Sequence, residues 1–205
     1  MDNRHDILQL LRQVAEGAVP PEEALSQLKR QPFEDLGYAK VDLHRGVRQG
    51  AAEVIYGAGK TPEQIAGIAA AMGERGCRNI LITRLSPEAA ELVAGTVPLD
   101  YHPIPKAAVA YPGERNALGH IVVATGGTSD MPVAEEAALT AEVMGNKVTR
   151  LYDVGVAGLH RLLANLETLT NARCVVAVAG MEGALASVVG GPVDCPVIAV
   201  PTSVG

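Results

Sequence analysis

The sequence has few aromatic residues: one phenylalanine, five tyrosines and no tryptophan among 205 residues. A protein that stacks nucleobases on aromatic platforms needs side chains that this chain hardly has. Apolar residues still make up 48% of the chain, and charged residues make up only 20%. This composition predicts a packed core of Val, Leu, Ile and Ala, which suits helices packed on a parallel sheet, and it excludes disorder.

The chain also lacks an excess of positive charge. Its formal net charge is −6, and no run of Lys or Arg occurs. Because affinity for nucleic acid comes largely from phosphate neutralisation, we expect no nucleic-acid partner. The polar N-terminus has no signal-type apolar core, and no apolar run is long enough to cross a bilayer. We therefore expect a cytoplasmic protein with no membrane partner.

Cysteine is scarce and has no metal-binding pattern. Cys77, Cys174 and Cys195 show neither ligand spacing nor a CxxC motif. Since two of them border apolar runs, we interpret them as buried small hydrophobic residues and predict no metal site.

The organisation of the chain predicts two domains, residues 1–113 and 114–205. The first domain begins with helical patterns at 7–16 and 20–28, and residues 31–42 are interpreted as irregular. Two Ser/Thr-Pro-Glu signatures then open helices at Thr61 and Ser86, because the hydroxyl caps the helix and proline suits its first turn. Strands are predicted at 53–56 and 79–83. Residues 97–112 are interpreted as a proline-punctuated connection to the second domain.

From Gly119 the sequence alternates strands and helices. The predicted strands are 121–125, 147–152, 173–179 and 197–200, and the predicted helices are 131–144, 156–166 and 182–189. This order predicts a small α/β domain followed by a parallel-sheet, three-layer α/β/α domain. Because the sequence stops just past a strand, we expect this second domain to be truncated at its C-terminus.

The loops after these four strands are the candidate site, because open α/β sheets bind ligands at the carboxyl ends of their strands. Each loop is rich in glycine, hydroxyls or carboxylates. The loop Gly126–Asp130 precedes a helix that opens near Pro132, so its N–H groups are predicted to cradle a phosphate. It matches neither a Walker A loop nor GxGxxG, and a plain turn capped by Ser129 or Asp130 is the alternative.

Three residues are candidate catalytic groups. Asp130 would accept hydrogen bonds from ribose hydroxyls, with capping of the helix as its alternative role. His160 is either a ligand-facing residue or an ordinary helix-surface histidine, and Glu182 is either a site carboxylate or an acid at a helix N-terminus.

The predicted substrate-binding residues come from both domains. In the first domain, Arg45, Arg48 and Lys60 either form a solvated charged face or clamp an anionic substrate. The remaining predicted residues lie in the strand-end loops of the second domain: Gly126, Gly127, Thr128, Ser129, Asp153, Gly155, Arg161, Gly180, Met181 and Ser203.

These motifs together resemble the LarB family, the pyridinium-3,5-biscarboxylic acid mononucleotide synthases of nickel-pincer cofactor biosynthesis. The resemblance covers essentially the whole chain. The segments that carry it are 45–61, 124–130, 153–161, 179–185 and 200–205.

The second domain also resembles AIR carboxylase of purine synthesis. That family has a Gly-Ser-x-Ser-Asp loop at the phosphoribosyl group, which Thr128, Ser129 and Asp130 would match. It follows its second strand with Ser-Ala-His-Arg, whereas this chain has Asp153-Val154-Gly155-Val156. The departure argues against purine chemistry, and His160 is not assumed to be equivalent to that histidine.

The LarB resemblance implies carboxylation of nicotinic acid adenine dinucleotide with CO2 at pyridinium C5, and hydrolysis of the phosphoanhydride to release AMP. It also implies a cysteine thiolate from a segment beyond the position of Gly205, so we expect this chain to bind but not to catalyse. We expect no tightly bound cofactor, and the alternative is an Mg2+ ion that arrives on the substrate pyrophosphate. We also expect a homo-oligomer. The alternatives are an AIR carboxylase-type purine enzyme and a non-catalytic nucleotide-binding module.

Overall fold

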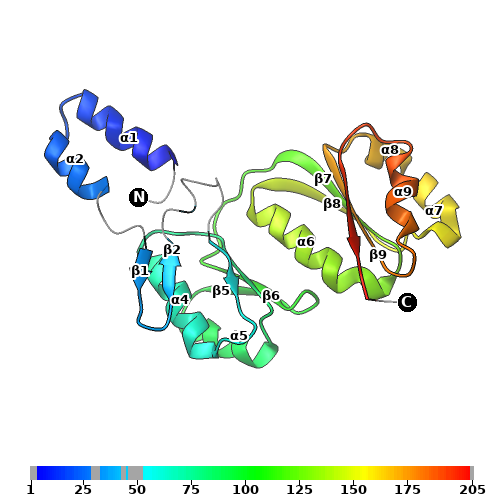
Figure 1. Ribbon diagram of the computed structural model, residues 1–205, viewed down its shortest axis with the longest axis horizontal. Coiled ribbons are helices and arrows are strands. Elements are labelled where there is room, and N and C mark those ends of the chain that lie inside the picture. The colour runs from blue at the N-terminus through cyan, green and yellow to red at the C-terminus, as the bar shows by residue number, and fades with distance from the viewer. Residues whose placement is uncertain (1–3, 29–32, 43–44, 46–52, 204–205) are drawn as a thin grey trace. The chain divides into compact units, whose positions relative to one another are not determined.

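The computed structural model describes residues 4–28, 33–42, 45 and 53–203, and the chain forms two compact units (Figure 1). The first unit comprises residues 1–101 and 108–113, and the second comprises residues 102–107 and 114–205. No helix in the described ranges has the length and apolar character that crossing a bilayer requires.

The first unit begins with two helices and a small hairpin. Helices α1 (Arg4–Ala15) and α2 (Pro21–Leu28) follow the predicted helical patterns. Strands β1 (Phe33–Asp35) and β2 (Lys40–Asp42) then pair antiparallel. The prediction of an irregular segment over 31–42 is therefore wrong for these strands. The Gly37 turn between them, whose N–H donates to Asp35 Oδ1 at 2.8 Å, sets the hairpin.

A four-stranded sheet forms the body of the first unit. Its order is β3-β4-β6-β5, from β3 (Ile55–Tyr56), β4 (Ile80–Thr83), β5 (Leu99–His102) and β6 (Ala107–Ala110). Strand β6 runs antiparallel to β4. The interpretation of 97–112 as a connection is therefore corrected, because Ala107–Ala110 is fully buried and fills the middle of the sheet.

The two proline-opened helices form as predicted. In α4 (Pro62–Glu74), Gln64 N donates to Thr61 Oγ1 at 3.3 Å and Thr61 N donates to Gln64 Oε1 at 3.0 Å, which completes a capping box. In α5 (Pro87–Ala94), Ala89 N donates to Ser86 Oγ at 3.2 Å. Both helices bury apolar residues in one core with β3, β4 and β6.

The second unit is a parallel sheet covered by helices on both faces, as predicted. Its order is β10-β9-β7-β8, from β7 (Leu118–Thr125), β8 (Asn146–Leu151), β9 (Cys174–Ala179) and β10 (Val197–Pro201), and every pairing is parallel. Figure 1 shows α6 (Met131–Val143) on one side of the sheet. Helices α7 (Leu159–Leu163), α8 (Leu166–Thr170) and α9 (Ala184–Gly190) lie on the other.

Alternation along β7 explains the three layers. Val122 and Ala124 pack into the core that contains Leu162, Leu169 and Leu185. Val123, between them, packs against Ala134 and Ala138 of α6. Successive side chains of a strand point to opposite faces, so one buried strand supplies both cores.

Two predicted helices of this unit differ in detail. The predicted helix 156–166 is a 3₁₀ turn, η2 (Val156–Gly158), followed by α7 and the separate α8. The predicted helix 182–189 begins later, at Ala184, because Gly183 before it has a left-handed φ of 66°. The turn η2 and residues 180–183 therefore lie between the carboxyl ends of their strands and the helices that follow.

Candidate functional site

The loop after β7 is held by a buried carboxylate. Gly126 N donates to Val178 O of β9 at 2.9 Å, which places the loop between two strand ends. Asp130 closes the short helix η1 (Thr128–Asp130) and is only 4% exposed. Its Oδ2 accepts from Gly127 N at 2.9 Å and its Oδ1 accepts from Thr202 Oγ1 at 2.7 Å. The carboxylate makes no capping bond to α6, and instead binds back to the glycine loop and across to the end of β10.

The loop after β8 is fixed on a buried threonine. Thr125 is fully buried, and its Oγ1 and carbonyl oxygen accept from Asp153 N at 3.0 Å and from Val154 N at 2.9 Å. These bonds hold Asp153 in the left-handed region, with φ of 57°. Gly155, two residues after Asp153, lies so close to the first loop that a Cβ atom would be 2.4 Å from Gly126 O. Only glycine allows the two loops to meet in this way.

Arg161 brings a positively charged side chain to the pocket. Its guanidinium forms an ion pair with Asp153 and passes over Gly158, where a Cβ atom would be 2.6 Å from Arg161 Nε. The side chain of Arg161 is 39% exposed, so its charge is accessible from the pocket that it lines. A planar, fixed guanidinium suits a carboxylate or phosphate group.

The loop after β9 supplies an exposed apolar side chain. Met181 has a left-handed φ of 54° and is 84% exposed. A left-handed conformation is unfavourable for residues other than Gly, Asn and Asp, so the fold holds this thioether at the surface against a local cost. Glu182 follows it and is exposed as well.

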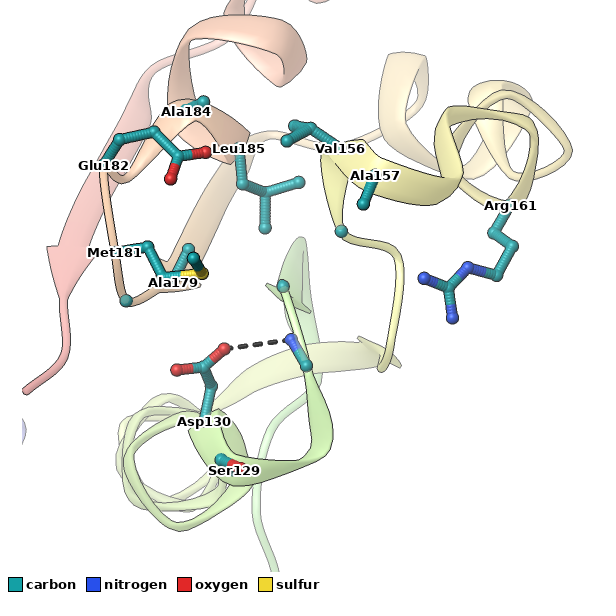
Figure 2. Close-up of a pocket in the computed structure, with 14 residues that line it drawn as sticks. Ser129, Asp130, Val156, Ala157, Arg161, Ala179, Met181, Glu182, Ala184 and Leu185 are labelled. Carbon is teal, nitrogen blue, oxygen red and sulfur yellow. Dashed lines mark hydrogen bonds between the residues drawn. The ribbon is translucent and has the colours of Figure 1, made fainter. Parts of the chain in front are cut away.

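These loops enclose a pocket of about 340 Å³ (Figure 2). Figure 2 shows Arg161 on one side, Met181 and Glu182 on the opposite side, and Asp130 and Ser129 below them. The pocket brings together these predicted site residues: Gly126, Gly127, Ser129, Asp130, Gly155, Arg161, Gly180, Met181 and Glu182.

Four predicted residues of the second unit do not line this pocket. Thr128, His160 and Ser203 are exposed elsewhere on their loops or helix, and Asp153 reaches the site only through its ion pair with Arg161. For His160 the arrangement corresponds to the surface histidine that was its alternative.

Sequence reasoning missed the apolar wall and two threonines. Val156, Ala157, Ala179, Ala184 and Leu185 also line the pocket. Their apolar character made them indistinguishable from core residues in the sequence. Thr202 and Thr125 hold the loops, and Thr202 could have been found by the strand-end rule that selected its neighbour Ser203.

Of the cations predicted to bind substrate in the first unit, Lys60 lines a different cavity. Arg48 lies outside the described residues. Lys60 Nζ donates to Tyr56 O at 2.8 Å, and Lys60 lines a separate cavity of about 240 Å³ with Lys40 and Glu53.

Burial raises the pKa of Glu53 in that cavity. Its Oε2 accepts from Asp42 N at 2.5 Å, a bond that acts in the opposite direction. The negative charge of Asp42 adds to the increase, and the positive charge of Arg45 reduces it.

The described residues contain no group of three or more His, Cys, Asp and Glu side chains arranged to hold a metal ion. The three cysteines, all in the part of the chain that the structure describes, form no disulfide and are partly buried, and none lines the pocket. Burial raises the pKa of the Cys174 thiol, with a further contribution from Cys195. A raised pKa is the opposite of what an activated thiolate needs.

The comparisons with known proteins match both units. Residues 33–112 match the model of the LarB/PurE-like N-terminal domain, and residues 120–205 match the model of AIR carboxylase. A protein of Methanocaldococcus jannaschii, named "Uncharacterized protein MJ0165", is 35% identical over 204 residues, covering 95% of this chain and 80% of that protein. The AIR carboxylase match indicates an enzyme of the carboxylase or mutase type. The pocket lies at the carboxyl ends of the parallel strands, the edge at which open α/β sheets bind ligands. With a LarB/PurE-like N-terminal domain joined to an AIR carboxylase domain, the chain belongs to the LarB family and is a carboxylase-type enzyme.

Proposed function

We propose that the protein carboxylates the pyridinium ring of nicotinic acid adenine dinucleotide with CO2 and hydrolyses its phosphoanhydride, giving pyridinium-3,5-biscarboxylic acid mononucleotide and AMP. The observation that carries the proposal is the composition of the pocket at the strand ends. An apolar wall, a glycine loop with a buried carboxylate, one guanidinium and one exposed carboxylate surround a single cavity.

The pocket suits the ring half of such a dinucleotide. Its volume of about 340 Å³ is at the lower end of the range of ligand pockets, so it holds a mononucleotide unit better than a whole dinucleotide. Val156, Ala179 and Leu185 offer apolar surface to a flat ring. Arg161 offers a paired hydrogen-bond donor to a carboxylate or phosphate.

The proposed chemistry uses the electrophilic character of the pyridinium ring. A thiolate adds to the ring and makes a neutral enamine, whose C5 attacks CO2 and forms the new C–C bond. A base then removes the C5 proton, and loss of the thiolate restores the aromatic ring. Water is consumed separately, when the phosphoanhydride is cleaved.

Among the described residues, the structure suggests one for the base of this scheme and none for its thiolate. Glu182 is exposed at the pocket and is our candidate for the base that removes the C5 proton. The thiolate is not assigned, because none of Cys77, Cys174 and Cys195 lines the pocket. The family resemblance implies that it follows the position of Gly205.

Three further features remain proposals. Mg2+ would arrive on the substrate pyrophosphate, which offers the hard oxygen ligands that it prefers. We also propose that the protein is a cytoplasmic homo-oligomer. Size-exclusion chromatography with light scattering tests the oligomer, and a monomer at micromolar concentration would contradict it.

Binding and turnover test the proposed function separately. We expect calorimetry on residues 1–205 to detect nicotinic acid adenine dinucleotide, and mass spectrometry to find no carboxylated product. With the complete product of the gene and 13C-labelled bicarbonate, we expect the labelled dicarboxylate mononucleotide together with AMP. A complete protein that yields neither product would refute the enzymatic proposal.

An AIR carboxylase-type purine enzyme is the second candidate, favoured by the match over residues 120–205. The absence of Ser-Ala-His-Arg after β8, where Asp153 and Gly155 stand, argues against it. Turnover of aminoimidazole ribonucleotide in the same assay would favour this candidate. Binding of adenine nucleotide without product, even with the complete protein, would favour a non-catalytic module.

A further inference from the structure

The carboxylate of Asp130 is committed to the protein. Its side chain is 4% exposed, one oxygen accepts from Gly127 N at 2.9 Å, and the other accepts from Thr202 Oγ1 at 2.7 Å. The dashed line at Asp130 in Figure 2 marks the hydrogen bond that its carboxylate accepts from Gly127 N. A group that transfers a proton to or from a substrate must lie within hydrogen-bonding reach of that substrate. The 4% exposure of Asp130, with one donor already on each oxygen, disfavours such a contact.

We propose that Thr202 is a positioning residue of the pocket, which acts through Asp130 to hold the glycine loop, and that Asp130 transfers no proton. The proposal deepens the proposed function and rests on it only for the identity of the ligand. It places the end of β10 in the binding machinery, although Thr202 does not line the pocket.

The topology explains why this link controls the loop. The loop after β7 leaves the sheet between β9 and β8, whereas Thr202 follows the edge strand β10. Thr202 N donates to Ala179 O at 3.1 Å, so its backbone is anchored to the end of β9. Its hydroxyl then reaches Asp130, and Asp130 reaches Gly127. The chain of bonds therefore fixes Gly127 relative to the strand end beneath Gly180 and Met181, which form the opposite wall.

The hydrogen bonds from Thr202 and Gly127 to Asp130 also determine where the Gly127 N–H points. With its N–H bonded to Asp130, Gly127 cannot offer that N–H to a ligand phosphate. The loop therefore contributes shape, and Ser129 remains its exposed polar side chain in the pocket. The proton-transfer role is left to Glu182, which has an exposed carboxylate on the pocket wall.

The test compares Thr202→Val, which removes the hydroxyl, with Thr202→Ser, which keeps it. Calorimetry with nicotinic acid adenine dinucleotide should show binding about tenfold weaker for T202V, in line with loss of one hydrogen bond to a charged group. T202S should bind within about twofold of the wild type. Thr149→Val is the matched control, because it removes a strand hydroxyl bonded to His120 at 2.8 Å outside the pocket.

A double-mutant cycle separates positioning through Asp130 from a general structural effect. Asp130→Asn should weaken binding at least as much as T202V, and adding T202V to D130N should change little further. Additive effects of D130N and T202V would overturn the proposal, as would T202V binding like the wild type or T202S binding as weakly as T202V.

Amide hydrogen exchange keeps the test independent of the ligand. Gly127 N–H should exchange at least tenfold faster in T202V than in the wild type, whereas T202S and T149V should leave it unchanged. If the wild type does not bind the dinucleotide, the proposed function fails and this exchange rate still decides the role of Thr202. If T202V does not fold, Thr202→Ala is measured in its place against the same criteria.

Discussion

Replacement of Gly155 by alanine tests the contact between the two loops most directly. The added Cβ would lie 2.4 Å from Gly126 O and 3.2 Å from the carbonyl carbon of Gly126. Contacts of a Cβ atom below 3.0 Å are essentially never found, so the loops must separate by about 0.6 Å. The atom in the way belongs to the backbone, and no side-chain rotation can relieve the clash.

The expected cost follows from the packing of the site. Overpacking of this kind costs about 1–3 kcal/mol in free energy of unfolding. The φ of Gly155 is −59°, which any residue adopts, so the cost is steric and contains no backbone strain. For a domain of about 100 residues, each kcal/mol lowers the Tm by about 4–8 °C.

Gly190→Ala is the matched control for Gly155→Ala. Gly190 ends α9, and a Cβ atom there would meet nothing within 4 Å. Both substitutions reduce the entropy of the unfolded chain equally, and G190A should stabilise the protein by about 0.5–1 kcal/mol. Urea unfolding gives the free energies, and calorimetry gives the affinity for the dinucleotide. A G155A variant that is as stable as G190A and binds as tightly would refute the reasoning about this contact.

Three further variants probe charge, strain and pH. Arg161→Lys keeps the positive charge but loses the planar guanidinium, so calorimetry should show the dinucleotide binding about tenfold more weakly. The control is Arg173→Lys, at an exposed position outside the pocket, which should bind the dinucleotide like the wild type. Met181→Gly relieves a left-handed backbone and should raise the free energy of unfolding by up to about 1 kcal/mol, while the affinity for the dinucleotide falls. A lower free energy of unfolding for this variant would contradict the strain argument. Because burial raises the folded-state pKa of Glu53, the free energy of unfolding of the wild type should fall relative to Glu53→Gln as the pH rises through and above 4.5, and parallel pH curves for the two proteins would contradict this.

Local patterns were sufficient for most of the elements in both units. Thr61 and Ser86 cap helices as the Ser/Thr-Pro-Glu signature predicts, because a cap depends on only a few neighbouring residues. The central strands β7 and β9 follow the apolar runs 121–124 and 175–179, since a strand covered on both faces is apolar where it is buried.

The strands at 99–102 and 107–110 escaped prediction because proline and turn residues interrupt the sequence around them. Ala107–Ala110 lies at the centre of the sheet only because Val109 pairs with Leu81, which is distant in the sequence. Such pairing is decided by tertiary packing and leaves no periodic signal in a segment of four residues.

The sequence by itself indicated where the candidate pocket lies, because parallel strands bring their carboxyl ends to one edge and the glycine, hydroxyl and carboxylate residues follow those ends. It could not determine what each side chain does there. Asp130 and Glu182 are both carboxylates next to strand ends, yet one is buried between Gly127 N and Thr202 Oγ1 and the other is exposed at the pocket. Only the tertiary structure decided between them, because burial and hydrogen-bond partners come from loops that are far apart in the chain and meet only when the sheet has formed.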